Sequence, residues 1–351
     1  MTTTVPTTTT KTLIAGPCSA ETREQVLAVA EGLQGGHVDY FRAGIWKPRT
    51  RPGSFEGVGT EGLDWLREVK QTCGFKVCTE VANVKHVYEA LKSGIDMVWI
   101  GARTSANPFA VQEIAEALQG VDIPVMIKNP VNADLNLWRG AIERIARAGI
   151  TEIAGIHRGF SRFGAFTYRN EPKWQIPIGL KQSHPEIPII CDPSHIGGKR
   201  AFVQPISQKA MDLDFDGLMI ETHTKPDEAW SDASQQVTPE DYHQLVAGLK
   251  LPTVSPQQDS QESLAALRGE IDDFDNQILD ILRNRMEVVQ RIAEFKKQHN
   301  MTILQKARWS AIEKRNAQLA DEFALEEKFV NQLFKAIHQG SIDRQERVMR
   351  E

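Results

Sequence analysis

The sequence predicts a (β/α)8 TIM barrel followed by an all-helical domain, and three observations support this. All 17 prolines of the 351-residue chain lie at or before Pro256, and only two of the 25 glycines follow it. Before this break, eight short apolar runs alternate with amphipathic helical patterns, as in repeated βα units around a buried parallel sheet. After it, the apolar spacing is helical throughout. Eight βα units in about 250 residues are typical of a TIM barrel.

The eight apolar runs are predicted as strands over residues 13–15, 40–43, 76–79, 97–100, 124–127, 152–156, 187–191 and 217–220. Helices are predicted between them over residues 21–33, 63–72, 84–92, 109–118, 135–148 and 201–212. The alternative, an open doubly wound sheet, needs a G-x-G-x-x-G phosphate loop after the first strand. Gly16-Pro17-Cys18-Ser19 does not supply it, so the barrel is favoured.

After the break, one long helix is predicted over residues 262–299, because apolar residues keep a three-four spacing from 264 to 295. Shorter helices are predicted over residues 307–320 and 325–349. A helix of 38 residues would be about 57 Å long, too long for these two helices to cover. We therefore expect a second copy of the chain to pack along it, giving a homodimer, with a tetramer as a further option.

These patterns set the expected domain boundaries. Residues 1–11 are a flexible tail, with seven threonines and no apolar segment typical of a signal peptide. Residues 12–250 form the barrel, and residues 251–261 form a proline-punctuated linker. Residues 262–351 form the helical domain. Because the first strand begins near Thr12, we expect no additional regulatory domain before the barrel.

The composition excludes several classes of partner. Lys plus Arg is 41 and Asp plus Glu is 46, a net charge of −5, so the chain has no basic surplus for nucleic acid or an anionic membrane. No stretch approaches the roughly 20 apolar residues of a membrane span. Four cysteines are too few for a disulfide framework and form no Cys-x-x-Cys pair. A cytoplasmic location is expected.

Polar residues collect where the predicted strands end, and TIM barrels place their chemistry at these ends. Six of them are cations, namely Arg42, Lys47, Arg49, Arg103, Lys128 and Arg158. Other polar residues there are Thr50, Glu80, His157, Asp192 and His223. A single Arg or Lys is ordinarily a solvated loop charge, but six in one mouth indicate an anionic substrate with more than one phosphate or carboxylate.

A thiol, an imidazole and two carboxylates also follow these strands, at Cys18, His195, Glu221 and Asp232. Such a mixed donor set suits Mn²⁺, Fe²⁺, Co²⁺ or Zn²⁺ rather than Mg²⁺ or Ca²⁺. The alternative is structural, with Cys18 as a small buried apolar residue and His195 as a hydrogen-bonding residue of a loop. Spacing alone leaves both interpretations open.

Six motifs occur in order between residues 11 and 249, namely Gly16-Pro17-Cys18-Ser19, Lys47-Pro48-Arg49-Thr50-Arg51-Pro52, Ile100-Gly101-Ala102-Arg103, Ile127-Lys128-Asn129-Pro130, Asp192-Pro193-Ser194-His195 and Gly217-Leu218-Met219-Ile220-Glu221. Together they resemble the type I beta DAHP synthases, which open the shikimate pathway. The resemblance implies condensation of phosphoenolpyruvate with erythrose 4-phosphate and release of phosphate. A sister synthase that uses arabinose 5-phosphate has Lys-Ala-Asn-Arg where this chain has Lys47-Pro48-Arg49-Thr50, so the four-carbon acceptor is favoured.

The resemblance also implies roles for individual residues. The implied ligands of a divalent metal ion, expected to be Mn²⁺ with Co²⁺, Fe²⁺ or Zn²⁺ as alternatives, are Cys18, His195, Glu221 and Asp232. The phosphate of phosphoenolpyruvate is implied to contact Arg103, Lys128, Arg158 and the backbone of Ala102. Its carboxylate is implied to contact Arg42 and Lys47, and the sugar phosphate Arg49 and Thr50. The implied catalytic lysines are Lys47 and Lys128.

In the long helix, the apolar register falls on Arg285, and a cation on such a stripe is costly unless an anion meets it. Lys296 lies on the same face, roughly 16 Å further along the helix axis. Arg268 lies about 25 Å from Arg285 along that axis, so the two cannot share a small site within one chain. An antiparallel partner helix could bring Arg268 there.

These residues resemble the all-helical chorismate mutases, whose intertwined dimer shares one arginine across its interface. The matching positions are Arg268, Arg285, Lys296, Arg308, Ser341 and Gln345. The resemblance implies rearrangement of chorismate to prephenate, with Arg285, Lys296 and Gln345 as catalytic residues. Gln305 and Trp309 replace acidic residues found in many members. The alternative is an inactive module for dimerisation and sensing, and feedback control of the synthase by the mutase domain is expected.

Overall fold

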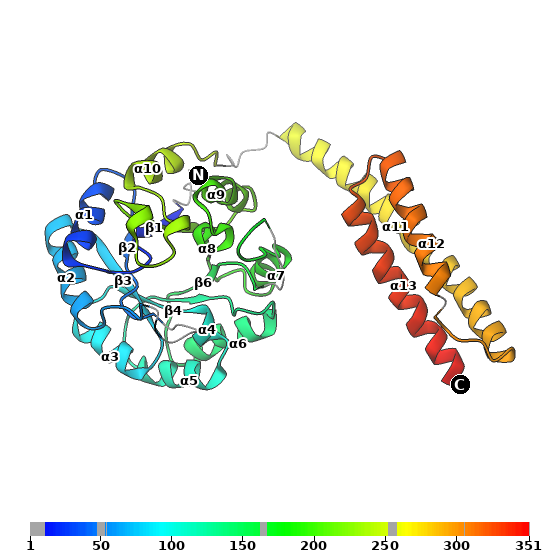
Figure 1. Cartoon of the computed structure of the whole chain (residues 1–351), viewed down its shortest axis with the longest axis horizontal. Coiled ribbons are helices and arrows are strands. Elements are labelled where there is room, and N and C mark those ends of the chain that lie inside the picture. Colours follow the sequence, from blue (N-terminus) through cyan, green and yellow to red (C-terminus); the bar gives the residue numbers. More distant parts are fainter. Residues whose placement is uncertain are drawn as a thin grey trace, which may run out of the picture. The chain divides into compact units, whose positions relative to one another are not determined.

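The computed structural model describes residues 11–47, 53, 55–161, 167–251, 258–304 and 306–350, without the side chains of residues 258–266, 270 and 306–308. The chain divides into two compact units, Met1–Thr253 and Val254–Glu351. The first is an α/β barrel and the second is all-helical (Figure 1). None of the described helices combines the length and the apolar character needed to cross a membrane.

Eight parallel strands close into a barrel in the order of the sequence, which confirms the predicted fold class. The strands are β1 (Thr12–Gly16), β2 (Tyr40–Arg42), β3 (Lys76–Val81), β4 (Met97–Ile100), β5 (Val125–Lys128), β6 (Ile153–His157), β7 (Ile189–Cys191) and β8 (Gly217–Glu221). The first and last strands pair in parallel along five residues, from Thr12 opposite Gly217 to Gly16 opposite Glu221. This closure brings the loops that follow β1 and β8 together.

Helices surround the strands (Figure 1). The longer ones are α1 (Arg23–Leu33), α2 (Glu61–Cys73), α3 (Val84–Lys92), α5 (Pro108–Ala117), α6 (Leu135–Arg147), α7 (Gln175–Ser183), α9 (Val203–Asp212) and α10 (Pro239–Ala247). Short helical turns follow several strands, namely α4 (Ala102–Ser105), α8 (Pro193–Gly197), η1 (Arg200–Phe202), η2 (Pro226–Glu228) and η3 (Ala233–Gln235). Six of the longer helices match the predicted segments, whereas α7 and α10 were not predicted.

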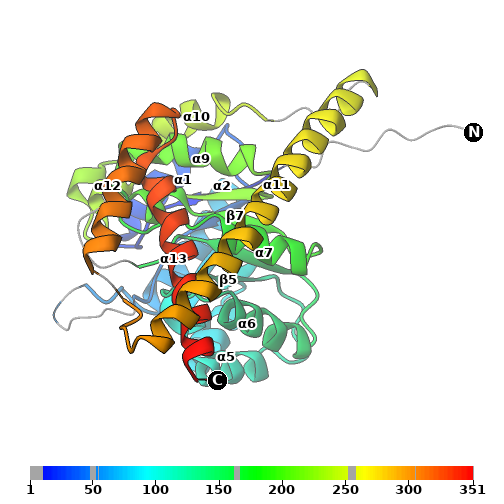
Figure 2. The same cartoon turned by 90° about the vertical axis from the view of Figure 1, so that its right-hand side faces the viewer.

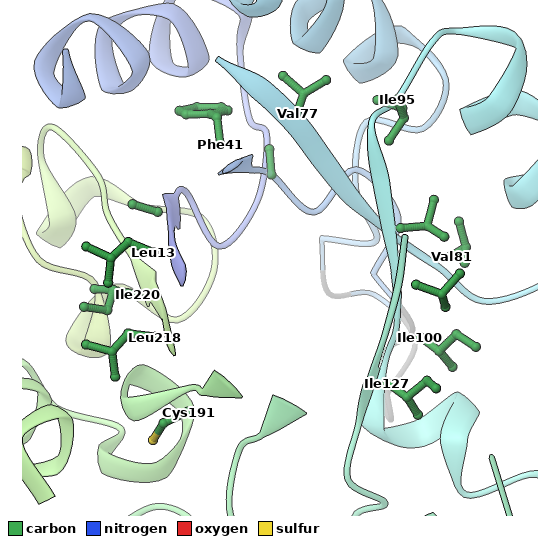
Figure 3. Packing of buried hydrophobic residues seen from close by; sticks show 14 of the residues in the cluster. Leu13, Phe41, Val77, Val81, Ile95, Ile100, Ile127, Cys191, Leu218 and Ile220 are labelled. Carbon is green, nitrogen blue, oxygen red and sulfur yellow. The ribbon is translucent and has the colours of Figure 1, made fainter. Parts of the chain in front are cut away.

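Two apolar layers stabilise the barrel. In the outer layer, strand residues such as Leu13, Phe41 and Leu218 pack with buried residues of the helices (Figure 3). The inner layer fills the barrel and includes Met97 and Trp99. Full burial of one such side chain contributes about 1.5–3 kcal/mol. These layers therefore stabilise the fold, and the strand ends are free to carry polar side chains.

The second unit contains α11 (Gln258–Gln298), α12 (Lys306–Glu322) and α13 (Glu327–Arg350). The three predicted helices are present, and α13 packs against both others. The long helix begins at Gln258, four residues before its predicted start and within the predicted linker. Neither proline nor glycine interrupts the chain between Pro256 and residue 262, so the helix can extend to this earlier start. The N-terminal part of α11 extends beyond α12 and α13 (Figure 2).

That extended part carries an exposed apolar stripe, defined here as Leu267, Ile271, Phe274, Ile278 and Ile281. Each of these residues is between 52 and 66% exposed. The three-four spacing places them on one face of α11. Contiguous apolar surface of this kind is typical of interaction sites.

Candidate functional site

A cluster of potential metal ligands lies at the carboxyl ends of β1 and β8. One ligand atom each of Cys18, Glu221 and Asp232 lies within 4.8 Å of the other two. Cys18 Sγ donates to Asp232 Oδ2 at 3.3 Å. We call these three residues the ligand cluster.

Glycine at position 16 allows the Cys18 turn to approach β2. Gly16 has φ +143°, and a Cβ there would lie 2.1 Å from the carbonyl oxygen of Arg42. This close approach is sterically open only to glycine. It places the carbonyl oxygen of Cys18 3.3 Å from Arg42 Nη2, which donates a hydrogen bond to it.

The chemistry of the ligand cluster suits a divalent transition-metal ion. Glu221 is fully buried, and its Oε2 accepts a hydrogen bond from Gln235 Nε2 at 2.7 Å. Its Oε1 has no aligned hydrogen bond, although Arg42 Nη2 lies 3.2 Å away. A buried carboxylate oxygen without a hydrogen bond is costly, and a bound cation would remove that cost. A thiol beside two carboxylates is a donor set for such an ion.

Cations already surround the thiol of Cys18. Lys47 Nζ lies 3.1 Å from Cys18 Sγ and also donates to the Cys18 carbonyl. Burial, followed by the carboxylate of Glu221, raises the pKa of Cys18 to about 12, and Lys47 acts in the opposite direction. The thiolate form therefore depends on positive charge close to the sulfur.

His195, predicted as a fourth ligand, lies beside the ligand cluster but not within it. Its Nε2 is 4.0 Å from Asp232 Oδ2, and its Nδ1 is 3.7 Å from Glu221 Oε1. Asp192 caps α8 by accepting a hydrogen bond from the backbone N–H of His195. The Asp192 carboxylate also contacts the ring, with Oδ2 2.9 Å from Nδ1. The Asp-Pro-Ser-His turn thus holds the imidazole toward the cluster.

Three of the cations predicted to bind the phosphate or carboxylate of the substrate are held in place by specific partners. Arg42 is 1% exposed and lies 4.9 Å from the Trp99 ring. Lys128 Nζ forms an ion pair with Asp192 Oδ2 at 2.8 Å. Arg158 Nη1 donates to Asn170 Oδ1 at 2.9 Å, and burial lowers the pKa of Arg158 to about 10. These side chains are held by the barrel and can receive an anion without large reorganisation.

Of the remaining residues predicted for the barrel site, the structure describes two and leaves two undescribed. Ala102 begins α4 directly after β4, and Arg103 follows it as an exposed residue. Arg49 and Thr50 lie outside the described residues. Their predicted contact with a sugar phosphate stays a prediction.

Sequence reasoning missed Arg169 and Gln235, and it assigned no role to Asp192. Arg169 Nη1 donates to Asp232 Oδ1 at 2.9 Å and to Gln235 Oε1 at 2.6 Å. Asp192 was recognisable at a strand end, whereas Arg169 lies in a loop and Gln235 ends the short turn η3, and neither belongs to a motif. Their contacts become visible only when the chain is folded.

The helical unit contains a second polar cluster between α11 and α13. Arg285 Nη1 donates to Ser341 Oγ at 2.6 Å, and Lys296 Nζ donates to Gln345 Oε1 at 3.1 Å. Lys296, Ser341 and Gln345 are each less than 9% exposed. Within the described part of the chain, neither cation has an ion-pair partner. Two cations on one helix face, each hydrogen-bonded to a neutral side chain, have the chemistry to bind carboxylates.

The structure describes only some of the other residues predicted for this unit. Arg268 is exposed in the extended part of α11. The side chain of Arg308 and the whole of Gln305 lie outside the described residues. Trp309 stacks on His338 with ring centroids 4.0 Å apart.

Comparisons with known proteins assign a family to each of the two units. The profile of the DAHP synthetase I family matches residues 7–251, and that of chorismate mutase type II matches residues 267–346. A phospho-2-dehydro-3-deoxyheptonate aldolase of Thermotoga maritima is 34% identical over 239 residues, or 68% of this chain and 69% of that protein. A 2-dehydro-3-deoxyphosphooctonate aldolase of Wolinella succinogenes is 29% identical over 269 residues, or 67% of this chain and 98% of that protein.

Solved structures of DAHP synthases are similar to about two thirds of the chain. The crystal structure of the Thermotoga maritima DAHP synthase is 34% identical with a TM-score of 0.61, covering 68% of this chain and 67% of that chain. A truncated form of the Thermotoga maritima enzyme is 30% identical with a TM-score of 0.59, covering 68% of this chain and 84% of that chain. This chain therefore belongs to the DAHP synthetase I family, and its C-terminal unit is a chorismate mutase type II domain.

Proposed function

We propose that the chain is a bifunctional enzyme of the shikimate pathway. Its barrel condenses phosphoenolpyruvate with erythrose 4-phosphate to DAHP and phosphate, and its helical domain converts chorismate to prephenate. The observation that carries the first activity is the position of Arg42 and Lys47, two cations that contact the ligand cluster. An anionic substrate bound by these cations would be held beside a Lewis-acid site.

Binding of phosphoenolpyruvate follows from the fixed cations. Lys128, Arg158 and Arg103, with the backbone of Ala102, hold its phosphate, because guanidinium and ammonium groups suit phosphate oxygens. Arg42 and Lys47 hold its carboxylate. Asp192 keeps Lys128 in place through the buried ion pair. This arrangement fixes C3 of the enol in one orientation for attack.

The acceptor aldose is bound through its phosphate and polarised at its aldehyde. Arg49 and Thr50 bind the phosphate of the aldose. Cys18, Glu221 and Asp232, with His195, hold a divalent ion, proposed to be Mn²⁺, with Co²⁺, Fe²⁺ or Zn²⁺ as alternatives. When bound, this ion polarises the aldehyde. C3 of phosphoenolpyruvate forms a bond to the aldehyde carbon as the carbonyl π bond breaks, and water adds at C2 and gives one proton to the aldehyde oxygen. The bond from C2 to the phosphate oxygen then breaks, and the second proton of the water leaves with phosphate as C2 becomes a ketone. Lys47 and Lys128 neutralise the anionic groups around these carbons.

In the helical domain, the cations act by positioning a dicarboxylate. Arg285 and Lys296 are held by Ser341 and Gln345, and Arg268 of a second copy and Arg308 complete the clamp. Holding both carboxylates favours the reactive conformer of chorismate. Lys296 and Gln345 donate to the ether oxygen, where negative charge develops as the bond breaks. The protein is a homodimer through the apolar stripe, because this stripe would otherwise be exposed; two such dimers could form a tetramer.

The mutase domain also controls the synthase domain by feedback, because a ligand that orders its helices can bias the attached barrel.

Purified full-length protein tests these activities. It is assayed with phosphoenolpyruvate plus erythrose 4-phosphate, with phosphoenolpyruvate plus arabinose 5-phosphate, and separately with chorismate. Turnover of the four-carbon aldose and of chorismate is expected. Preference for the five-carbon aldose would favour the activity named in relatives such as the Wolinella succinogenes protein. Absence of prephenate formation would leave the helical domain as a dimerisation and sensing module.

A further inference from the structure

Glu21 is a buried carboxylate that the proposed reaction does not use. It follows the Cys18 turn at the end of β1 and is 5% exposed. Its Oε1 accepts a hydrogen bond from the backbone N–H of Trp230 at 2.7 Å. Its Oε2 lies 3.4 Å from His223 Nε2. A carboxylate is costly to bury unless it is paired or hydrogen-bonded, so its partners indicate what it does.

His223 is oriented for this contact by a second backbone group. The N–H of Lys225 donates to His223 Nδ1 at 2.9 Å. A neutral imidazole that accepts at Nδ1 carries its proton on Nε2, the nitrogen that faces Glu21. Glu21 therefore contacts the loop after β8 at two points, His223 near its start and Trp230 further on.

The backbone that Glu21 holds leads directly to the ligand cluster. Trp230 lies two residues before Asp232, and the hydroxyl of the intervening Ser231 hydrogen-bonds that of Ser19. Asp232 has φ +51°, in the left-handed region that residues other than glycine adopt infrequently, although aspartate does so more readily than most. Surrounding contacts must maintain such a conformation. The Trp230 and Ser231 contacts supply this constraint immediately before Asp232.

A further contact fixes the chain four residues after Asp232. The backbone N–H of Cys18 donates to Gln236 Oε1 at 3.0 Å. The turn of residues 18–21 therefore holds the chain on both sides of Asp232, and the same turn carries Cys18. Two members of the ligand cluster are thus positioned by one short segment.

We propose that Glu21 is a positioning residue of the metal site, which holds Asp232 close to Cys18 by accepting the N–H of Trp230. This inference rests on the metal site proposed above. Among the described residues, the Glu21 oxygens make hydrogen-bond or ion-pair contacts with Trp230 and His223 and with no member of the ligand cluster. Glu21 therefore acts through the backbone of the loop. Removal of residues that support metal ligands typically lowers metal affinity about 10–100-fold.

Binding of Mn²⁺ to the chelator-treated full-length protein tests this role without an activity measurement. Free Mn²⁺ is followed by electron paramagnetic resonance. Glu21→Ala is expected to raise the Kd for Mn²⁺ about 10–100-fold. Glu21→Gln keeps an acceptor for the N–H of Trp230 and is expected to restore most of the affinity. Glu21→Asp keeps the charge but shortens the side chain, so an intermediate Kd is expected, and this variant serves if the alanine variant does not fold.

A matched control is available at the opposite end of β1. Asp39 Oδ2 accepts the backbone N–H of Leu13 at 2.7 Å, so Asp39→Ala removes a similar hydrogen bond far from the ligand cluster. Its Kd for Mn²⁺ is expected to equal that of the wild type. At saturating Mn²⁺, the KM for phosphoenolpyruvate is expected to be unchanged in the Glu21 variants. The cations proposed to bind this substrate follow strands other than β1 and β8.

Several results would overturn the proposal. These are wild-type affinity in both Glu21→Ala and Glu21→Asp, an equal loss of affinity in Asp39→Ala, or a glutamine variant as weak as alanine. If the wild-type protein binds no Mn²⁺, the metal site itself is wrong, and that result is distinct from wild-type affinity in the variants.

Discussion

Cys18 Sγ lies 3.3 Å from Asp232 Oδ2, although 214 positions separate the two residues in the sequence. The closed barrel produces this proximity, because β1 pairs with β8 and the loops after the two strands meet. Glu221, the last residue of β8, joins them within 4.8 Å. Barrel closure therefore assembles a donor set that no local sequence motif contains.

The first prediction is that the synthase reaction depends on a divalent metal ion. Chelator treatment is expected to abolish DAHP formation, and Mn²⁺ is expected to restore it, because the acceptor carbonyl needs a Lewis acid. Cys18→Ser is expected to weaken metal retention, since a hydroxyl is a poorer ligand than a thiolate for these ions. Metal content and both activities are measured on the same samples. The mutase reaction is the internal control and is expected to be unaffected, and full synthase activity without metal would contradict the prediction.

Most of the barrel could be predicted from sequence, because its strands are buried on both faces and therefore appear as apolar runs. The prediction for β4 agrees with the structure at both ends, as does that for α3. The helix α7 was missed because Pro177 and Gly179 lie within its nine residues. Pro177 is in the first turn, where a helix does not need the backbone N–H. The short α10 was missed although Thr238 and Asp241 form a capping box at its start.

The candidate site was less accessible to sequence reasoning. Residues that directly follow strands could be identified, because parallel strands end at one mouth. Residues that act from within long loops could not be identified, and Arg169 and Gln235 are examples. Glu21 was included only as the start of a predicted helix, whereas α1 begins at Arg23 and leaves Glu21 free to contact the loop after β8. Such contacts depend on loop conformations that no residue pattern specifies.

The second prediction concerns stability at low pH. His157 is fully buried beside Trp174 and Phe160, and burial lowers its pKa to about 3 from an ordinary 6.5. Between these values the unfolded chain binds a proton that the folded chain does not. The free energy of unfolding is therefore expected to fall as the pH drops below 6.5, by up to about 1.4 kcal/mol per pH unit from this residue.

His157→Phe should remove that contribution while keeping an aromatic ring in the same apolar surroundings. The free energy of unfolding of both proteins is measured with urea between pH 6.5 and 4 and followed by tryptophan fluorescence. This signal reports on the barrel, because six of the seven tryptophans precede residue 251. The variant is expected to show a shallower pH dependence than the wild type. Parallel pH profiles would show that His157 is not protonated differently in the two states.

The third prediction is that the apolar stripe forms the dimer. Ile278→Glu places a charge on the stripe and is expected to shift the protein toward monomers in sedimentation experiments, because burial of an unpaired carboxylate is unfavourable. Asn276→Glu adds the same charge to the opposite face of α11 and is the control. Dimers that persist equally in both variants would place the interface elsewhere.

The fourth prediction is that two chains share each mutase site. Arg268 and Arg285 lie 17 residues apart on one helix, about 25 Å along its axis, so one chain cannot supply both to one ligand. Arg268→Ala and Arg285→Ala are each expected to abolish chorismate turnover. Mixed dimers of the two variants should regain turnover, because one of their two sites contains both arginines. If subunit exchange is verified and no turnover returns, the shared-site arrangement is wrong.

The fifth prediction is that prephenate inhibits DAHP formation through the helical domain. Prephenate carries two carboxylates, and Arg285 and Lys296 have no ion-pair partner in the described part of their unit. Binding is expected to order the helices around these cations. The two units are joined by a short segment, since α10 ends at Ala247 and α11 begins at Gln258, and it contains Pro252 and Pro256. We expect a short connection that contains two prolines to transmit a change in the helical unit to the barrel.

A coupling free energy of about 1–3 kcal/mol is typical of such linkage and corresponds to roughly 5–150-fold in affinity. Synthase rates are therefore measured with increasing prephenate in three proteins. The full-length wild type is expected to be inhibited. A chain truncated after Pro256 should keep synthase activity and lose inhibition, because the binding site is gone. Arg285→Ala should behave like the truncated chain while keeping its helical domain, which separates ligand binding from the mere presence of that domain. Equal sensitivity of all three proteins would place prephenate at the barrel itself.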